Sequence, residues 1–101
     1  MHVVELFLPL TRNDGAPQPR ALFAAVRREL VERFGGLTAF TRAPAEGLWA
    51  DGCGVEADRI VVFEVMDEAF DAGWWRGYRE GLEQRFEQEE VLVRASESLR
   101  L

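Results

Sequence analysis

The sequence has only one cysteine, Cys53, and one histidine, His2, among its 101 residues. A single cysteine cannot form an intrachain disulfide, which is typical of proteins from reducing compartments. One histidine and one cysteine far apart in the chain do not make a zinc or iron site without several carboxylates. We therefore expect no metal and no cofactor, and a haem ligated by His2 is the alternative that this residue leaves open.

Positive charge is also scarce, because 12 basic residues stand against 18 acidic ones and the net charge is −6. Such a surface repels phosphate backbones and anionic lipid head groups, so we expect no nucleic-acid partner and no membrane association. No apolar run approaches the length of a membrane span, and the first ten residues lack the basic start and cleavage pattern of a signal peptide. These absences predict a cytoplasmic protein.

The apolar patterns that are present occur in the order strand, helix, strand, strand, helix, strand. The predicted elements are Val3–Leu10, Pro19–Phe34, Leu37–Arg42, Ile60–Met66, Phe70–Gln88 and Val91–Ala95. This order is the split βαβ signature. It predicts a single α+β domain over residues 1–101, with the ferredoxin-like βαββαβ topology, a four-stranded antiparallel sheet and two helices on one face.

Proline supports the expected strand order, in which the second strand lies at an edge of the sheet. Pro44 follows the second strand pattern, and Leu48–Ala50 continues that pattern beyond it. Proline within a sheet is confined to edge strands and bulges. We therefore expect a bulge around Ala43 and Pro44 in an edge strand.

Two glutamates, Glu5 and Glu64, each interrupt a strand that is otherwise apolar. Side chains alternate between the faces of a strand, so both glutamates are expected on the face away from the helices. Arg42 and Arg94 would reach the same face from the edge strands, which predicts the cross-strand pairs Glu64–Arg42 and Glu5–Arg94.

An apolar cleft with a few convergent charges is typical of a small-molecule site. Glu5 and Glu64 are therefore the candidate catalytic residues, either of which could act as a general base. The candidate ligand-binding residues are Arg42, Arg94, Phe7, Phe40 and Trp49. The alternative is that these charges form structural ion pairs on an exposed face or in a subunit interface.

The element order resembles that of the dimeric α/β-barrel proteins, whose ferredoxin-like subunits bring their open sheet faces together around a cavity. The segment Phe34–Phe40 (FGGLTAF), followed by Gly47-Leu48-Trp49, is similar to that of short bacterial proteins of unknown function. The resemblance implies a homodimer, and an open sheet face rich in Val, Ile, Phe and Met would be apolar enough to need covering. No catalytic motif of a characterised family matches, so no site residue is carried over.

The second helical segment has a glycine at every fourth position, Gly73, Gly77 and Gly81, next to the pair Trp74 and Trp75. Three helical glycines cost roughly 2.5–3 kcal/mol relative to alanine, which predicts close packing on the sheet or on a partner, with helix flexibility near a ligand as the alternative. Adjacent tryptophans point about 100° apart on a helix, so one of them should lie at a rim, an interface or a pocket wall.

We expect a small soluble protein that binds, or binds and transforms, a small apolar or anionic metabolite in the sheet cleft of a homodimer. The alternative is a non-catalytic dimeric module that binds another protein through Trp75 and the glycine stripe.

Overall fold

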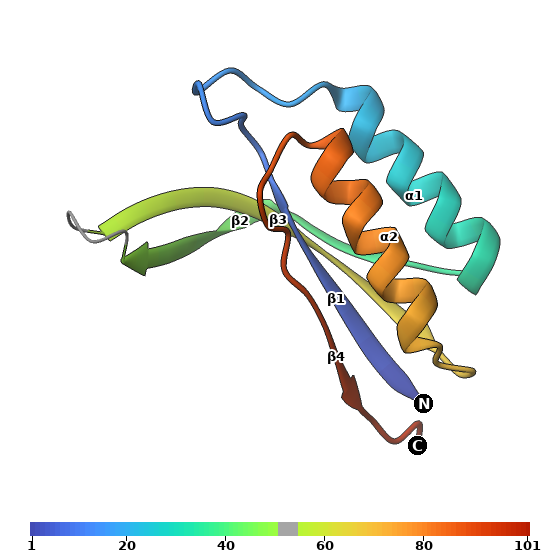
Figure 1. Ribbon diagram of the computed structural model, residues 1–101. Helices are drawn as coiled ribbons and strands as arrows, with labels where there is room; N and C mark the ends of the chain where they lie inside the picture. Colours follow the sequence, from blue (N-terminus) through green and yellow to red (C-terminus); the bar gives the residue numbers. More distant parts are fainter. Residues whose placement is uncertain (51–54) are drawn as a thin grey trace.

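The computed structural model describes the backbone of residues 1–50 and 55–101, and the side chains of residues 1–41, 48 and 59–101. Its elements are β1 (His2–Pro9), α1 (Arg20–Phe34), β2 (Thr38–Ala50), β3 (Val55–Asp67), α2 (Ala72–Arg85) and β4 (Val93–Glu97). Figure 1 shows both helices on one side of a single sheet. The predicted ferredoxin-like βαββαβ architecture is therefore confirmed.

The sheet has the strand order β2-β3-β1-β4, and every neighbouring pair is antiparallel. β2 is at an edge, as its proline predicts. The register of β2 against β3 shifts between Phe40 and Ala45, where the sequence predicts a bulge. β1 pairs only with the Ile60–Asp67 part of β3, so the rest of β3 and its partner on β2 form an arm beyond the other strands (Figure 1).

Two aspartates precede α2, and only Asp71 caps it. The carboxylate of Asp71 accepts the Trp74 N–H at 3.1 Å and the helix begins at Ala72. Asp67 is instead buried, and its carboxylate accepts the Trp75 indole N–H at 2.9 Å and the Ala69 N–H at 3.2 Å. A cap must directly precede the first turn, and Asp67 lies too far upstream to reach it.

The core lies between the helices and one face of the sheet. Because Glu5 and Glu64 were predicted on the opposite face, the residues that alternate with them in β1 and β3 should be covered, and all are buried: Val4, Leu6, Leu8, Val61, Phe63 and Val65. Val26, Leu30, Trp75 and Leu82 of the helices, with Phe86 and Val91 after α2, complete the core. Leu22, Phe23 and Phe34 pack partly buried against it. Gly35, with φ 83°, ends α1 in the left-handed conformation that glycine allows.

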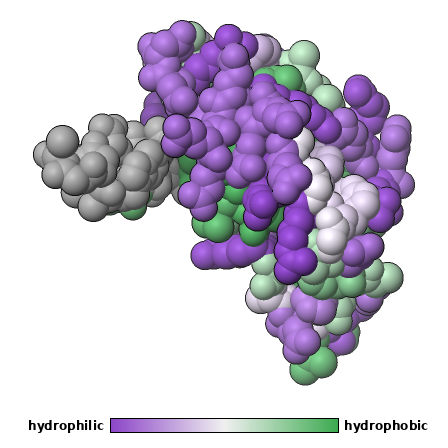
Figure 2. Space-filling view, in the orientation of Figure 1, coloured by the Kyte–Doolittle hydropathy of each residue, from purple (hydrophilic) through white to green (hydrophobic). Residues whose placement is uncertain are grey.

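The surface on the helix side is mostly hydrophilic over α1 and α2 and turns hydrophobic toward the strands (Figure 2). In the part of the chain that the structure describes, neither helix has the length and apolar composition that crossing a bilayer requires.

Candidate functional site

The open face of the sheet has a row of charged side chains across its centre. Glu64 of β3 lies directly opposite Glu5 of β1, and Glu5 lies opposite Arg94 of β4. On the other side of Glu64, the backbone of Thr38 on β2 completes the row. Val4 and Leu6 are buried under the helices, so the alternation of the strand directs Glu5 away from the core. The two candidate carboxylates are therefore neighbours on one face.

Apolar residues flank this charged row on both sides. In the register of the sheet, Phe40, Val62 and Phe7 lie across one side, and Met66 and Val3 lie across the other. Phe40 and Met66 are each 50% exposed, whereas Val62, between the two phenylalanines, is 9% exposed. The face therefore offers an apolar surface with two carboxylates in its middle.

Glu5 forms the ion pair with Arg94 that the sequence predicts. The Arg94 Nε donates to Glu5 Oε1 at 2.9 Å, and its guanidinium carbon lies 4.9 Å from the centre of the Phe7 ring. The Arg94 side chain is 60% exposed, and exposed pairs of this kind contribute about 0–1 kcal/mol. The pair therefore orients Glu5 more than it stabilises the fold.

Glu64 is half-buried and has no ion pair with any side chain that the structure describes. The predicted partner was Arg42, but the register places Thr38, not Arg42, opposite Glu64. Arg42 follows Phe40 within the bulged part of β2, and its side chain lies outside the described residues, as does that of Trp49. Like charges directly opposite each other on a sheet are destabilising, so Glu64 beside Glu5 has a cost that no described contact offsets.

His2 lies on the helix side of the sheet, away from the two glutamates. Its ring stacks on Phe70 with centroids 4.2 Å apart, and its Nε2 is 4.0 Å from the Glu97 carboxylate. Over the residues that the structure describes, no group of three His, Cys, Asp or Glu side chains is arranged to hold a metal ion. Cys53 lies outside the described residues.

Trp75 cannot be the exposed anchor of a protein-binding surface, because it is 4% exposed and its indole N–H is bound to Asp67. Trp74 is the less buried of the pair, with the Arg33 guanidinium 4.0 Å above its ring. The glycine stripe also does not pack closely on the sheet, because a Cβ at Gly77 or Gly81 would meet nothing within 4 Å. Close packing of Gly77 and Gly81 on the sheet is therefore not found among the described residues, and packing of the stripe on a partner stays a prediction.

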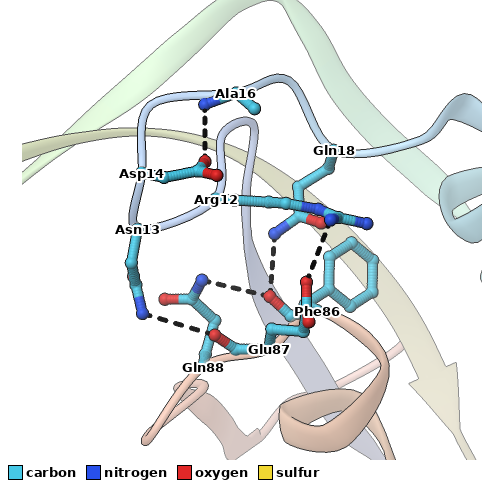
Figure 3. Close-up of polar contacts among 8 residues, drawn as sticks. All are labelled: Arg12, Asn13, Asp14, Ala16, Gln18, Phe86, Glu87 and Gln88. Carbon is cyan, nitrogen blue, oxygen red and sulfur yellow. Dashed lines mark hydrogen bonds and ion pairs between the residues drawn. The ribbon is translucent and has the colours of Figure 1, made fainter.

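No sequence pattern predicted the contacts of the loop between β1 and α1, whose polar side chains bind Phe86 and Glu87 just after α2 (Figure 3). The buried Gln18 amide donates to the Phe86 carbonyl at 2.8 Å, and Arg12 pairs with Glu87 at 3.2 Å. Asn13 donates to the Glu87 carbonyl at 3.4 Å. Polar loop residues that reach a helix end have no periodic pattern, so only the unusual length of the loop marks it in the sequence.

No protein-family model matches the chain, and no curated protein matches it. A phage SAM lyase in complex with S-methyl-5'-thioadenosine is similar over 95% of this chain and 80% of that one, with a TM-score of 0.64 and 17% identity. A phage SAM lyase in its apo state is similar over 94% of this chain and 78% of that one, with a TM-score of 0.63 and 16% identity. At this identity the likeness shows that the chain shares the fold of these structures.

Proposed function

We propose that this protein binds a small organic molecule on the open face of its sheet, with Glu5 and Glu64 as its polar anchors. The proposal rests on one observation: Glu5 and Glu64 lie directly opposite each other on neighbouring strands, in the middle of an apolar surface. An apolar surface with a few placed polar groups is the usual composition of a small-molecule site.

The charges of the row favour a ligand with hydrogen-bond donors or a positive charge. Among the side chains that the structure describes, two carboxylates and one guanidinium leave an excess of negative charge in the row, and the guanidinium of Arg94 is already bound to Glu5 at 2.9 Å. An anionic ligand would have to displace Glu5 from Arg94, whereas a cationic or donor group would reduce the repulsion between the two glutamates. The apolar part of the ligand would lie against Phe7 and Phe40.

The two glutamates would have different roles. Glu5 is oriented by Arg94, so it suits a fixed hydrogen-bond acceptor. Glu64 has no such partner among the described side chains, so it is the carboxylate that we assign to accept a proton or a donor hydrogen bond from the ligand. Thr38 and Phe40 of β2 border it in the register of the sheet.

The structural likeness supports a small-molecule ligand and supplies a probe. The lyase that shares this fold binds S-methyl-5'-thioadenosine, which combines a flat base, hydrogen-bond donors and an apolar thioether. Those groups match the composition of the open face. This molecule is therefore the first compound to titrate against the protein by calorimetry.

The deciding experiment is native mass spectrometry of the protein purified from its own host. We expect the wild type to carry a co-purified small molecule, and Glu64→Gln to lose it, because the amide keeps the shape but removes the charge. Glu68→Gln is the matched control, since Glu68 is an exposed carboxylate paired with Arg100 at 2.8 Å away from the row. A wild-type protein free of small molecules, or equal loading of all three proteins, would overturn the proposal.

A further inference from the structure

The two edges of the sheet are built differently. The β2 edge contains Pro44 and a shift of register, which are among the features that prevent an edge from pairing with another strand. The β4 edge has neither, because its five residues Val93–Glu97 pair in unbroken register with β1 and contain no proline. β4 is nevertheless mostly exposed, and Figure 1 shows it at the outer edge of the sheet.

The hydrogen bonds of β4 define which of its backbone groups are free. Phe7 N–H donates to the Leu92 carbonyl at 3.0 Å, and Ser98 N–H donates to the Met1 carbonyl at 2.9 Å. Along an antiparallel ladder, every second residue directs its backbone N–H and C=O groups toward the neighbouring strand, so the backbone groups of Arg94 and Ser96 also point toward β1. The N–H and C=O groups of the alternate residues therefore point out of the sheet. These residues are Val93, Ala95 and Glu97.

The same three residues share the helix side of the sheet, where a groove of about 200 Å³ lies between α2 and β4. Val93 and Ala95 line it from the strand, and Arg76 and Arg79 line it from the helix, with no acidic residue among the lining. Arg76 has no ion pair with a described side chain. The described carboxylates nearest to Arg79 are at 3.8 and 3.9 Å, and its buried Nε has no hydrogen-bond partner among the described residues. The groove is thus a basic site on a chain of net charge −6.

We propose that a second copy of this chain joins the β4 edge as an antiparallel strand, β4 against β4, centred on Ala95. In this register Ala95 lies opposite the partner's Ala95, and Val93 lies opposite the partner's Glu97. The outward backbone groups of these residues form the hydrogen bonds between the two strands. Opposite residues share a face, so the partner's Glu97 lies on the helix side, beside Arg76 and Arg79. Glu97 is accessible for this contact, since its side chain is 89% exposed and its one ion pair with a described residue is with His2 at 4.0 Å.

Two further features suit this arrangement. Ala95 and Ser96, at the centre of the strand, are small and allow a second backbone to approach. The symmetric pairing forms each Glu97–arginine contact twice, because a two-fold interface repeats every contact. The pairing leaves Glu5 and Glu64 uncovered, so it does not depend on the proposed ligand site and departs from a dimer closed over the open faces.

Sedimentation equilibrium of the full chain at micromolar concentration tests the proposal, with Ala95→Pro as its sharpest variant. Proline removes only an outward N–H, which leaves the pairing of β4 with β1 intact, and edge strands tolerate such a proline. We expect a wild-type particle of twice the 11.5 kDa chain mass and a rise in the dissociation constant of roughly tenfold or more in the variant. Ala95→Ser keeps the N–H and is expected to remain a dimer.

The charge contact is tested by reversal and exchange. Glu97→Arg should weaken the dimer, and the double variant Glu97→Arg with Arg76→Glu should restore it. Glu32→Arg makes the same change of charge on an exposed site of α1 and should have no effect. Circular dichroism and thermal unfolding establish that each variant is folded.

Hydrogen exchange of the wild type gives an independent readout. In the β4–β4 dimer the amides of Val93, Ala95 and Glu97 are protected, whereas in any other arrangement they exchange as free edge amides. A wild-type monomer overturns the proposal. So does a dimer that survives both Ala95→Pro and Glu97→Arg but dissociates in Phe40→Asp, since that result places the second copy over the open face.

Discussion

The two faces of the sheet are formed by alternate residues of the same strands, and they differ in the partners that their carboxylates have. On the covered face, Asp67 is 5% exposed and both of its oxygens accept hydrogen bonds, from Trp75 and Ala69. On the open face, Glu64 faces another carboxylate, Glu5, and no described cation pairs with it. The hydrogen bonds of Asp67 give it a role in the stability of the fold. No described contact gives Glu64 such a role, and this difference is the reason to propose a function for the open face.

The largest expected effect comes from comparing two phenylalanines on opposite faces. Phe63 is fully buried under the helices, so Phe63→Ala should lower the free energy of unfolding by about 3–5 kcal/mol. Phe7 is only partly buried on the open face, and Phe7→Ala should have less than half that effect. Urea unfolding measures both values. Equal losses would break the comparison, because they would mean that the open face is as buried in solution as the core.

The covered carboxylate should have a middle-sized effect. Asp67→Ala leaves the indole N–H of Trp75 buried without an acceptor, which is expected to lower the free energy of unfolding by about 1–3 kcal/mol. The adjacent Glu68→Ala removes an exposed pair with Arg100 and should change stability by about 0–1 kcal/mol. Thermal unfolding of the two variants side by side checks this; similar melting temperatures would show that the Asp67 contacts contribute little.

The open-face carboxylate should have a small effect of the opposite sign. Glu64→Val removes the repulsion between opposed glutamates and suits a strand, so we expect a gain of roughly 0.2–1 kcal/mol in the free energy of unfolding. Glu5→Val also removes the ion pair with Arg94, so its gain should be smaller. A marked loss of stability in Glu64→Val, seen by urea unfolding, would mean that Glu64 has a structural partner and would remove the argument for function.

The last comparison concerns the pH dependence of Tyr78, the single tyrosine of the chain, on the helix side. Burial raises the pKa of Tyr78, and the hydrogen bond that its hydroxyl donates to Glu29 at 2.8 Å raises it further. When the pKa of a group is higher in the folded state than in the unfolded state, the group stabilises the fold at pH values below its unfolded-state pKa. This contribution is lost as the pH rises through the folded-state pKa. An absorbance titration at alkaline pH should therefore show that Tyr78 ionises above the ordinary tyrosine pKa of about 10. Ionisation at that ordinary pKa would contradict the burial and the hydrogen bond to Glu29.

The sequence predicted the parts of the fold that depend on periodicity. The element order, the edge position of the strand that contains Pro44, and the buried face from Val4 to Val65 follow from apolar alternation, and all were confirmed. The Glu5–Arg94 pair followed from the same alternation, because β1 and β4 pair without interruption.

What the sequence could not predict depends on register and local competition. Alternation assigns a residue to a face but does not set the register between two strands, so Thr38 rather than Arg42 faces Glu64, in the part of β2 that precedes the shift between Phe40 and Ala45. The choice of Asp71 over Asp67 as the helix cap depends on where the first turn begins, which tertiary packing decides. The inward position of Trp75 was equally open, because either tryptophan of the pair could have taken it. No pattern in the sequence identifies the ligand.

The most direct test of the open-face site is a nuclear magnetic resonance comparison of the isotope-labelled protein with and without the small-molecule extract of its host cells. If the open face binds a ligand, the amide shift changes should cluster on β1 and β3 around Glu5, Phe7, Val62 and Glu64, and Glu64→Gln should abolish them. Unchanged spectra, or changes confined to α1 and α2, would contradict a ligand site at the two glutamates.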